Sequence, residues 1–157
     1  MIFNEFKSNS KVWMYISPCI IDKPSQNLIR DEFLIFSNTW KSHGDQVNGQ
    51  LLFMDGYVLI IGADFKGDSI CGRAVDSQVK FVKDLELKTG LTLMNRQNIC
   101  VKEESNSYTV PFSNLKQLVN NGNIDENTLI YNSMIQSNNE SPIVQMSHSP
   151  FGGIVLS

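Results

Sequence analysis

Hydrophobic residues recur along the chain with two different spacings, and each spacing predicts one kind of element. Residues 12–16 are rich in aromatic and β-branched side chains and stop before Ser17-Pro18, which predicts a first strand. Across residues 25–43 the apolar positions fall three or four residues apart, which predicts an amphipathic helix, and Gly44 is placed to end it. The apolar stripe of this helix consists of Ile29, Phe33, Phe36 and Trp40.

The middle of the chain predicts a hairpin and a second helix. The pair Asp55-Gly56 tolerates the two positive φ angles of a type I′ turn, so we expect a hairpin to turn there. Asp76 is placed to accept hydrogen bonds from the free N–H groups at the start of a helix, and Gly90 is placed to end it. The hairpin strands are residues 51–54 and 57–61, and the helix carries Val79, Val82 and Leu85.

The last third predicts two strands, a short helix and a final strand. Ser113 is placed to cap the short helix, which ends before Gly122. The expected strands are residues 98–101, 108–110 and 128–131. The resulting order, β-α-β-β-α-β-β-α-β, predicts an α+β fold with a mainly antiparallel sheet and helices packed on one face.

The end of the chain differs in composition from the rest. We expect residues 1–136 to form a single α+β domain and residues 137–157 to form a polar linker and a C-terminal tail. The strand at residues 128–131 is expected to be an edge of the sheet. The tail is too apolar for a solvated linker, so we expect it to dock either on its own sheet or on a second copy, which would make a homodimer. Its apolar residues are Ile143, Val144, Met146, Phe151, Ile154, Val155 and Leu156.

Composition narrows the classes of function. The 157-residue chain has a net charge of -3, which leaves no basic surface for nucleic acid, and no apolar run is long enough to span a membrane. Cys19, Cys71 and Cys100 lie far apart without close Cys or His partners, so we expect reduced thiols and neither a metal site nor a cofactor. The first ten residues lack a hydrophobic signal segment, which predicts a cytoplasmic location.

Several runs of the sequence together resemble a known family. In order they are Val12-Trp13, residues 40–44, residues 74–86, Asn95-Arg96 and residues 128–132. They are similar to a family of small cytosolic proteins, mainly from Bacteroidetes bacteria, that are commonly named ABC transporter ATPase. The resemblance covers roughly residues 12–137 and implies a bacterial, cytosolic, single-domain protein without an established activity. Arg73 stands where the family commonly has Cys, and Asn95 stands where Asp is usual.

That family name requires a nucleotide site, and one segment comes near to it. Residues 62–69, Gly-Ala-Asp-Phe-Lys-Gly-Asp-Ser, follow a predicted strand and have the glycine spacing and the terminal serine of a P-loop. A P-loop needs a lysine before that serine to neutralise phosphate charge, whereas Asp68 has the opposite charge. The Leu-Ser-Gly-Gly-Gln signature is also missing. We therefore do not expect ATP to bind, and a nucleotide hydrolase is kept as an alternative implied by the resemblance.

A cysteine offers the second enzymatic interpretation. Cys71 precedes the predicted second helix, whose dipole lowers the pKa of a nearby thiol, and His43 is a candidate base. The simpler interpretation makes Cys71 an ordinary loop thiol and His43 a cation that faces the carbonyl end of the first helix. A pocket shared by His43, Cys71 and Asp76 would favour the thiol hydrolase.

The remaining candidate site is a set of polar and aromatic residues near the helix ends. Trp40 and His43 are three residues apart and so share one face of the predicted helix, although Trp40 also fits the core stripe. Exposed arginines suit anions or partner carboxylates. The candidate ligand-binding residues are Trp40, His43, Arg73, Asp76 and Arg96. The leading hypothesis is a non-catalytic binding or protein-interaction domain; the alternative is one of the two hydrolases.

Overall fold

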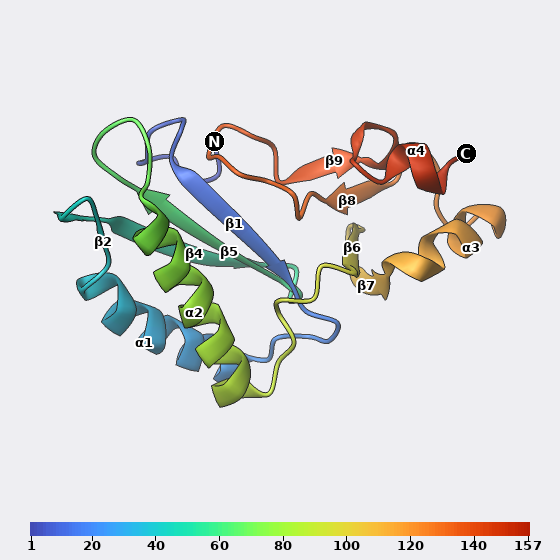
Figure 1. Ribbon diagram of the computed structural model, residues 1–157. Coiled ribbons are helices and arrows are strands. Elements are labelled where there is room, and N and C mark those ends of the chain that lie inside the picture. Colours follow the sequence, from blue (N-terminus) through green and yellow to red (C-terminus); the bar gives the residue numbers. More distant parts are fainter.

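The chain folds into two main antiparallel sheets and one small two-stranded sheet, with helices packed against the main sheets. The computed structural model describes residues 1–157 (Figure 1). The first sheet has the order β1-β5-β4 and the second the order β7-β6-β8-β9. The strands of the first sheet are β1 (Lys11–Ile16), β4 (Asn48–Met54) and β5 (Val58–Asp64). Those of the second are β6 (Asn98–Lys102), β7 (Tyr108–Pro111), β8 (Leu129–Tyr131) and β9 (Ile143–Gln145).

Each of the two main sheets has its own pair of helices. The two long helices, α1 and α2, pack on the first sheet, whereas the two short ones, α3 and α4, pack on the second (Figure 1). Their bounds are α1 Lys23–Asn38, α2 Gly72–Thr89, α3 Leu115–Asn120 and α4 Gly152–Val155. The fold class is therefore α+β with antiparallel sheets, as predicted. None of the helices combines the length and hydrophobicity needed to cross a membrane.

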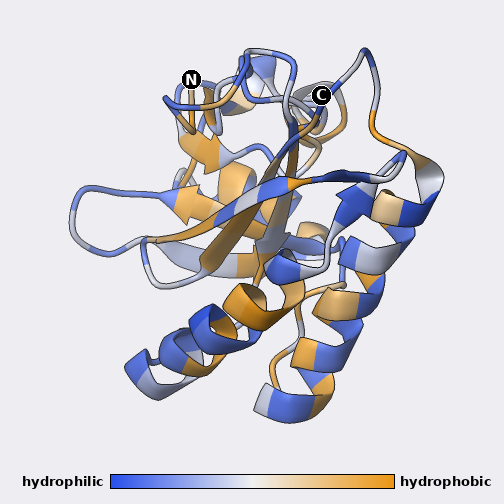
Figure 2. Ribbon diagram, turned by 90° about the vertical axis from the view of Figure 1, so that its left-hand side faces the viewer, coloured by the Kyte–Doolittle hydropathy of each residue, from blue (hydrophilic) through white to orange (hydrophobic).

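Both faces of the first sheet are buried, which explains why the strands divide into two sheets. In β1, Trp13 and Tyr15 point toward α1 and α2, whereas Val12, Met14 and Ile16 belong to a cluster on the opposite face. Cys100 and Tyr131 of the second sheet, with Phe3 and Phe6 of the N-terminal segment, complete that cluster. In Figure 2 the strands are coloured mostly hydrophobic, whereas the long helices alternate between hydrophobic and hydrophilic. A single continuous sheet would leave the second face of β1 in water.

The hairpin at Asp55-Gly56 and the end of α2 at Gly90 are confirmed. Asp55 and Gly56 have φ values of 54° and 79°, and the Tyr57 N–H donates to the Met54 carbonyl. Gly90 is in the left-handed conformation with φ 74°, and its N–H donates to the Glu86 carbonyl. Local turn chemistry is sufficient to fix both features.

The predicted end of the first helix was wrong. Helix α1 stops at Asn38, with Thr39 as its C-cap, and Trp40 lies outside it. Two short strands, β2 (Lys41–Ser42) and β3 (Asp45–Gln46), then form a hairpin whose turn is His43-Gly44, with φ values of 52° and 82°. Trp40 continues the apolar stripe of α1 because the chain turns back and buries its ring beside Phe36, not because the helix continues.

Two predicted caps were also wrong. Helix α2 begins at Gly72 with Cys71 as its N-cap, so Asp76 is an exposed residue inside the helix. The earlier start places Ala74 in the core at the first turn. Ser113 lies in a 3₁₀ turn (Phe112–Asn114) that leads into α3, and no side chain caps that helix.

The C-terminal tail packs on its own chain. Strand β9 pairs with β8, so the predicted edge strand at residues 128–131 is internal and that prediction was wrong. Met146 and Val155 are buried in the cluster between the second sheet and the short helices. Phe151 lies against Phe112 with ring centroids 5.6 Å apart. The tail therefore takes up an edge that the rest of the chain would leave open.

Hydrogen bonds and an ion pair connect the two main sheets. Asp55, in the turn of the first sheet, accepts hydrogen bonds from Lys102 Nζ at 2.7 Å and from the Tyr131 hydroxyl of the second sheet. Burial opposes the charge of this carboxylate, but these two donors outweigh burial and hold the pKa of Asp55 below its usual value. Arg96 forms a second link, because it donates to the carbonyls of Met14 in β1 and Ser133 after β8.

Candidate functional site

The residues predicted to bind a ligand do not form one site. Trp40 is 2% exposed, and its Nε1 donates to the Ala74 carbonyl at 2.9 Å, so its single donor is used inside the core. Asp76 projects from the exposed face of α2. None of the five main hollows on the surface is lined by His43, Cys71 or Asp76. The pocket that would have favoured a thiol hydrolase is therefore not found among them.

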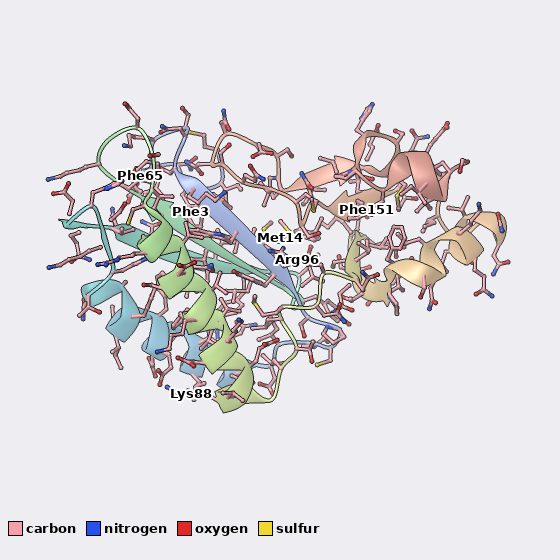
Figure 3. The ribbon with its side chains drawn as sticks, viewed as in Figure 1. Phe3, Met14, Phe65, Lys88, Arg96 and Phe151 are labelled. Atoms are coloured by element: carbon pink, nitrogen blue, oxygen red, sulfur yellow. The ribbon has the colours of Figure 1, made fainter.

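Arg96 lies elsewhere, at the junction of the two sheets. Its Nη1 donates to the Met14 carbonyl at 3.3 Å and to the Ser133 carbonyl at 3.2 Å, and its guanidinium lies 5.6 Å from the centre of the Tyr15 ring. Figure 3 shows Arg96 beside Met14, between the first sheet and the second. Through these contacts Arg96 connects the two sheets.

The β2–β3 hairpin and the start of α2 do come together around Cys71. The Cys71 N–H donates to Ser42 Oγ at 2.9 Å, which ties the hairpin to the helix. The thiol receives hydrogen bonds from the His43 N–H, the Ser42 hydroxyl and the N–H groups of Ala74 and Arg73, in decreasing order of effect. Burial opposes them, but together they lower the pKa of Cys71 to about 7.

This thiol is activated, but its surroundings lack the other parts of a catalytic centre. His43 contributes its backbone N–H to Cys71, and no hydrogen bond of its imidazole is present. The four donors around the thiol are therefore three backbone N–H groups and one hydroxyl, without a base to accept a proton. No group of three or more His, Cys, Asp or Glu side chains is arranged to hold a metal ion. The surroundings of Cys71 therefore favour a reactive thiolate, which an alkylating reagent can modify.

The segment that resembled a P-loop is explained by packing. Gly62 is a buried residue of β5, and a Cβ atom there would lie 2.4 Å from Cε2 of Phe3. The strand continues to Asp64, so the first glycine lies within the sheet and not in a loop. Lys7 donates from Nζ to the Phe65 carbonyl and also lies 4.9 Å from the centre of the Phe65 ring.

The surface most open to a partner is the outer edge of β4. This strand has seven residues, Asn-Gly-Gln-Leu-Leu-Phe-Met, and it pairs only with β5. Apart from the turn bond at Met54, its backbone makes no hydrogen bonds outside that pairing. It contains no charged residue, no proline and no break in its register with β5. Proteins commonly protect an edge strand with one of these features, and β4 has none of them.

The other edges are shorter or covered. The outer side of β1 is covered by the bridge between Lys11 and Ser137 and by the hydrogen bond from the Val12 N–H to the Gln136 carbonyl. Strand β9 has three residues, and β7 has four and ends in Pro111. The contrast identifies β4 as the one long, unprotected edge of the fold.

Two hollows flank β4, one on each face of the first sheet. On the helix side a hollow of about 300 Å³ lies between α1 and β4. Its lining residues are Arg30, Phe33, Leu34, Ser37, Gly49, Gln50 and Leu51. On the other side a hollow of about 410 Å³ lies between β4, the N-terminus and a loop. That one is lined by Met1, Ile2, Leu52, Met54 and residues 139–142. Successive side chains of an added strand would point to opposite faces and so enter both hollows.

The sequence predicted the hairpin that contains β4 but placed the free edge elsewhere. The signal was present in the uncharged run from Asn48 to Met54, but an edge is defined by which strands pair at long range. The contribution of Ser42 to the Cys71 thiol was likewise missed. The chain has no match among family models, curated proteins or solved structures.

Proposed function

We propose that this chain is a non-catalytic, cytoplasmic protein-interaction domain that binds an extended strand along β4. The observation that carries the proposal is the unprotected seven-residue edge with a hollow on each face. Backbone hydrogen bonds would supply affinity, and the two hollows would select side chains at alternate positions of the added strand. The exposed Leu34, at 66% of its maximal exposure, lies in the helix-side hollow and offers apolar surface to such a strand.

The enzymatic alternatives have less support. A thiol hydrolase would use Cys71, but that thiol lacks an imidazole partner and adjoins none of the main hollows. A nucleotide hydrolase would use residues 62–69, where Gly62 is packed under Phe3 and Asp68 has the wrong charge for phosphate. The family that the sequence resembles has no established activity, so the resemblance does not favour either hydrolase.

The proposal is tested by selecting ligands without assuming their sequence. Peptides of about ten residues, long enough to pair with all of β4, are selected from a random displayed library against the full chain. Binding is then mapped by amide chemical shifts. We expect the selected peptides to perturb β4 and the flank of α1 around Leu34, and to bind less well to a Leu51→Lys variant than to a Leu87→Lys control. Leu87 is 85% exposed on α2, away from the edge. Perturbations that centre on Cys71, or on the hollow that Phe36 of α1 and Phe81 of α2 line, would refute the proposal.

A further inference from the structure

The β4 edge is self-complementary in sequence. When two copies of an antiparallel strand pair around a central residue, each position lies opposite its mirror position in the partner. For the seven residues of β4 the centre is Leu51, which then lies opposite Leu51 of the second copy. The other pairs are Gln50 with Leu52, Gly49 with Phe53 and Asn48 with Met54. This register uses the full length of the strand and places no charges opposite each other.

We propose that the occupant of the β4 edge is the β4 of a second copy of this chain, paired antiparallel about Leu51 to make one six-stranded sheet. This inference rests on the proposed function of the same edge. A pairing of this kind is isologous and closed, so it consumes both free edges and leaves none for further growth. The twofold symmetry also keeps the α1–α2 layers of both copies on the same face, since Leu51 points toward the helices in each.

The pair Gly49–Phe53 is the feature that fixes the register. A Cβ atom at Gly49 would lie 2.9 Å from Cζ of Phe33 and 3.1 Å from Cζ3 of Trp40, so glycine lets α1 approach this end of β4 closely. Phe33 and Trp40 therefore already fill the space over Gly49. In the proposed register Phe53 of the second copy lies opposite Gly49 and beside Phe33, at the helix-side hollow that Gly49 and Phe33 line.

The environment of the edge suits a neutral, apolar partner. The guanidinium of Arg30 lies 4.9 Å from the centre of the Phe53 ring and so covers one face of this side chain in each copy. The half-buried Leu51, Leu52 and Met54 lose further exposure when the second strand is added. No residue of β4 repels a second β4, and a second copy is present wherever the chain is made. These points favour self-pairing over a foreign peptide.

Complementary charges at the centre of symmetry test this pairing. Because Leu51 lies opposite itself, Leu51→Lys places two like charges side by side, and Leu51→Glu does the same. We expect the unmodified chain to show twice its 17.7 kDa mass in light scattering and each single variant to show 17.7 kDa. We expect an equimolar mixture of the two variants to recover the doubled mass, because Lys and Glu then lie opposite each other. Leu87→Lys serves as the control for added charge on exposed apolar surface and should leave the mass doubled.

The outcomes separate this inference from the proposed function. Recovery in the mixture also shows that both variants fold, since unfolded chains would not regain a dimer. An unmodified chain that stays at 17.7 kDa at high concentration overturns self-pairing; if selected peptides still map to β4, the proposed function stands. A doubled mass that persists in both single variants overturns the β4 interface and places any dimer contact elsewhere. A mixture that stays monomeric while both variants melt cooperatively overturns the register about Leu51.

Discussion

Gly62 has two competing explanations, core packing and phosphate binding, and a substitution at this position distinguishes them. In the structure its missing side chain makes room for Phe3, since a Cβ atom at Gly62 would lie 2.4 Å from Cε2 and 2.6 Å from Cδ2 of that ring. Phe3 is held in place because its N–H donates to Asn138 Oδ1 and its carbonyl accepts from Asn138 Nδ2, both at 2.8 Å. Gly62→Ala therefore meets a ring that cannot simply move aside.

The expected cost follows from these contacts. Overpacking of a core by one methyl group costs about 1–3 kcal/mol, and complete displacement of a buried phenylalanine about 3–5 kcal/mol. We expect Gly62→Ala to lower the free energy of unfolding by about 2–3 kcal/mol. In a chain of this size that corresponds to a fall of roughly 2–4 °C in melting temperature for each kcal/mol. Gly72→Ala is the matched control, because no heavy atom lies within 4 Å of its added Cβ.

A double-mutant cycle tests whether this cost comes from the contact between position 62 and Phe3. Chemical denaturation of Gly62→Ala, Phe3→Ala and the double variant should show that the alanine at position 62 costs little once the Phe3 ring is gone. If Gly62→Ala is as stable as the Gly72→Ala control, or costs the same with and without Phe3, the packing explanation of Gly62 is refuted.

Three further predictions concern the thiol, the nucleotide and the tail. In a Cys19→Ser background, the alkylation rate of Cys71 should rise with pH through a midpoint near 7, because the thiolate is the reactive form. Ser42→Ala should move this midpoint to higher pH. An unchanged midpoint in that variant would contradict the hydrogen bond assigned to Ser42. ATP with magnesium should give no heat of binding in calorimetry, whereas micromolar binding that is lost in a Ser69 variant would overturn this. Deletion of residues 142–157 should destabilise the chain by on the order of 5 kcal/mol or more, because it removes Met146 and Val155 from the core; unchanged melting would show that the tail does not pack on its own sheet.

Local chemistry predicted the parts of the fold that depend on a few neighbouring residues. The positive φ angles of Asp55 and Gly56 and the C-cap at Gly90 follow from the small residue types at those positions. The end of α1 was missed because Trp40 lies at the right spacing for a helix while being brought to the same cluster by a turn. The sequence does not distinguish these two routes to one buried position, because periodicity reports burial and not backbone path.

Long-range pairing accounts for the other differences. Asp76 has the residue type of an N-cap, but the helix begins earlier because Ala74 is needed in the core and Cys71 is held by Ser42. Neither contact is visible before the β2–β3 hairpin is placed beside α2. The same limit applies to the candidate site. Strand β4 is an edge because it pairs only with β5, and it is the one long unprotected edge because β9 covers β8 and residues 136–137 cover β1.

Amide hydrogen exchange along β4 is the measurement that tests most directly whether this edge is a binding surface. Alternate N–H groups of β4 point away from β5 and have no partner within the chain, so at low concentration they should exchange faster than those of β5. Raising the protein concentration, or adding a selected peptide, should slow exchange at these outward amides and leave exchange in β7 unchanged. Exchange along β4 that is the same at every concentration and with every peptide would show that this edge is not a binding surface.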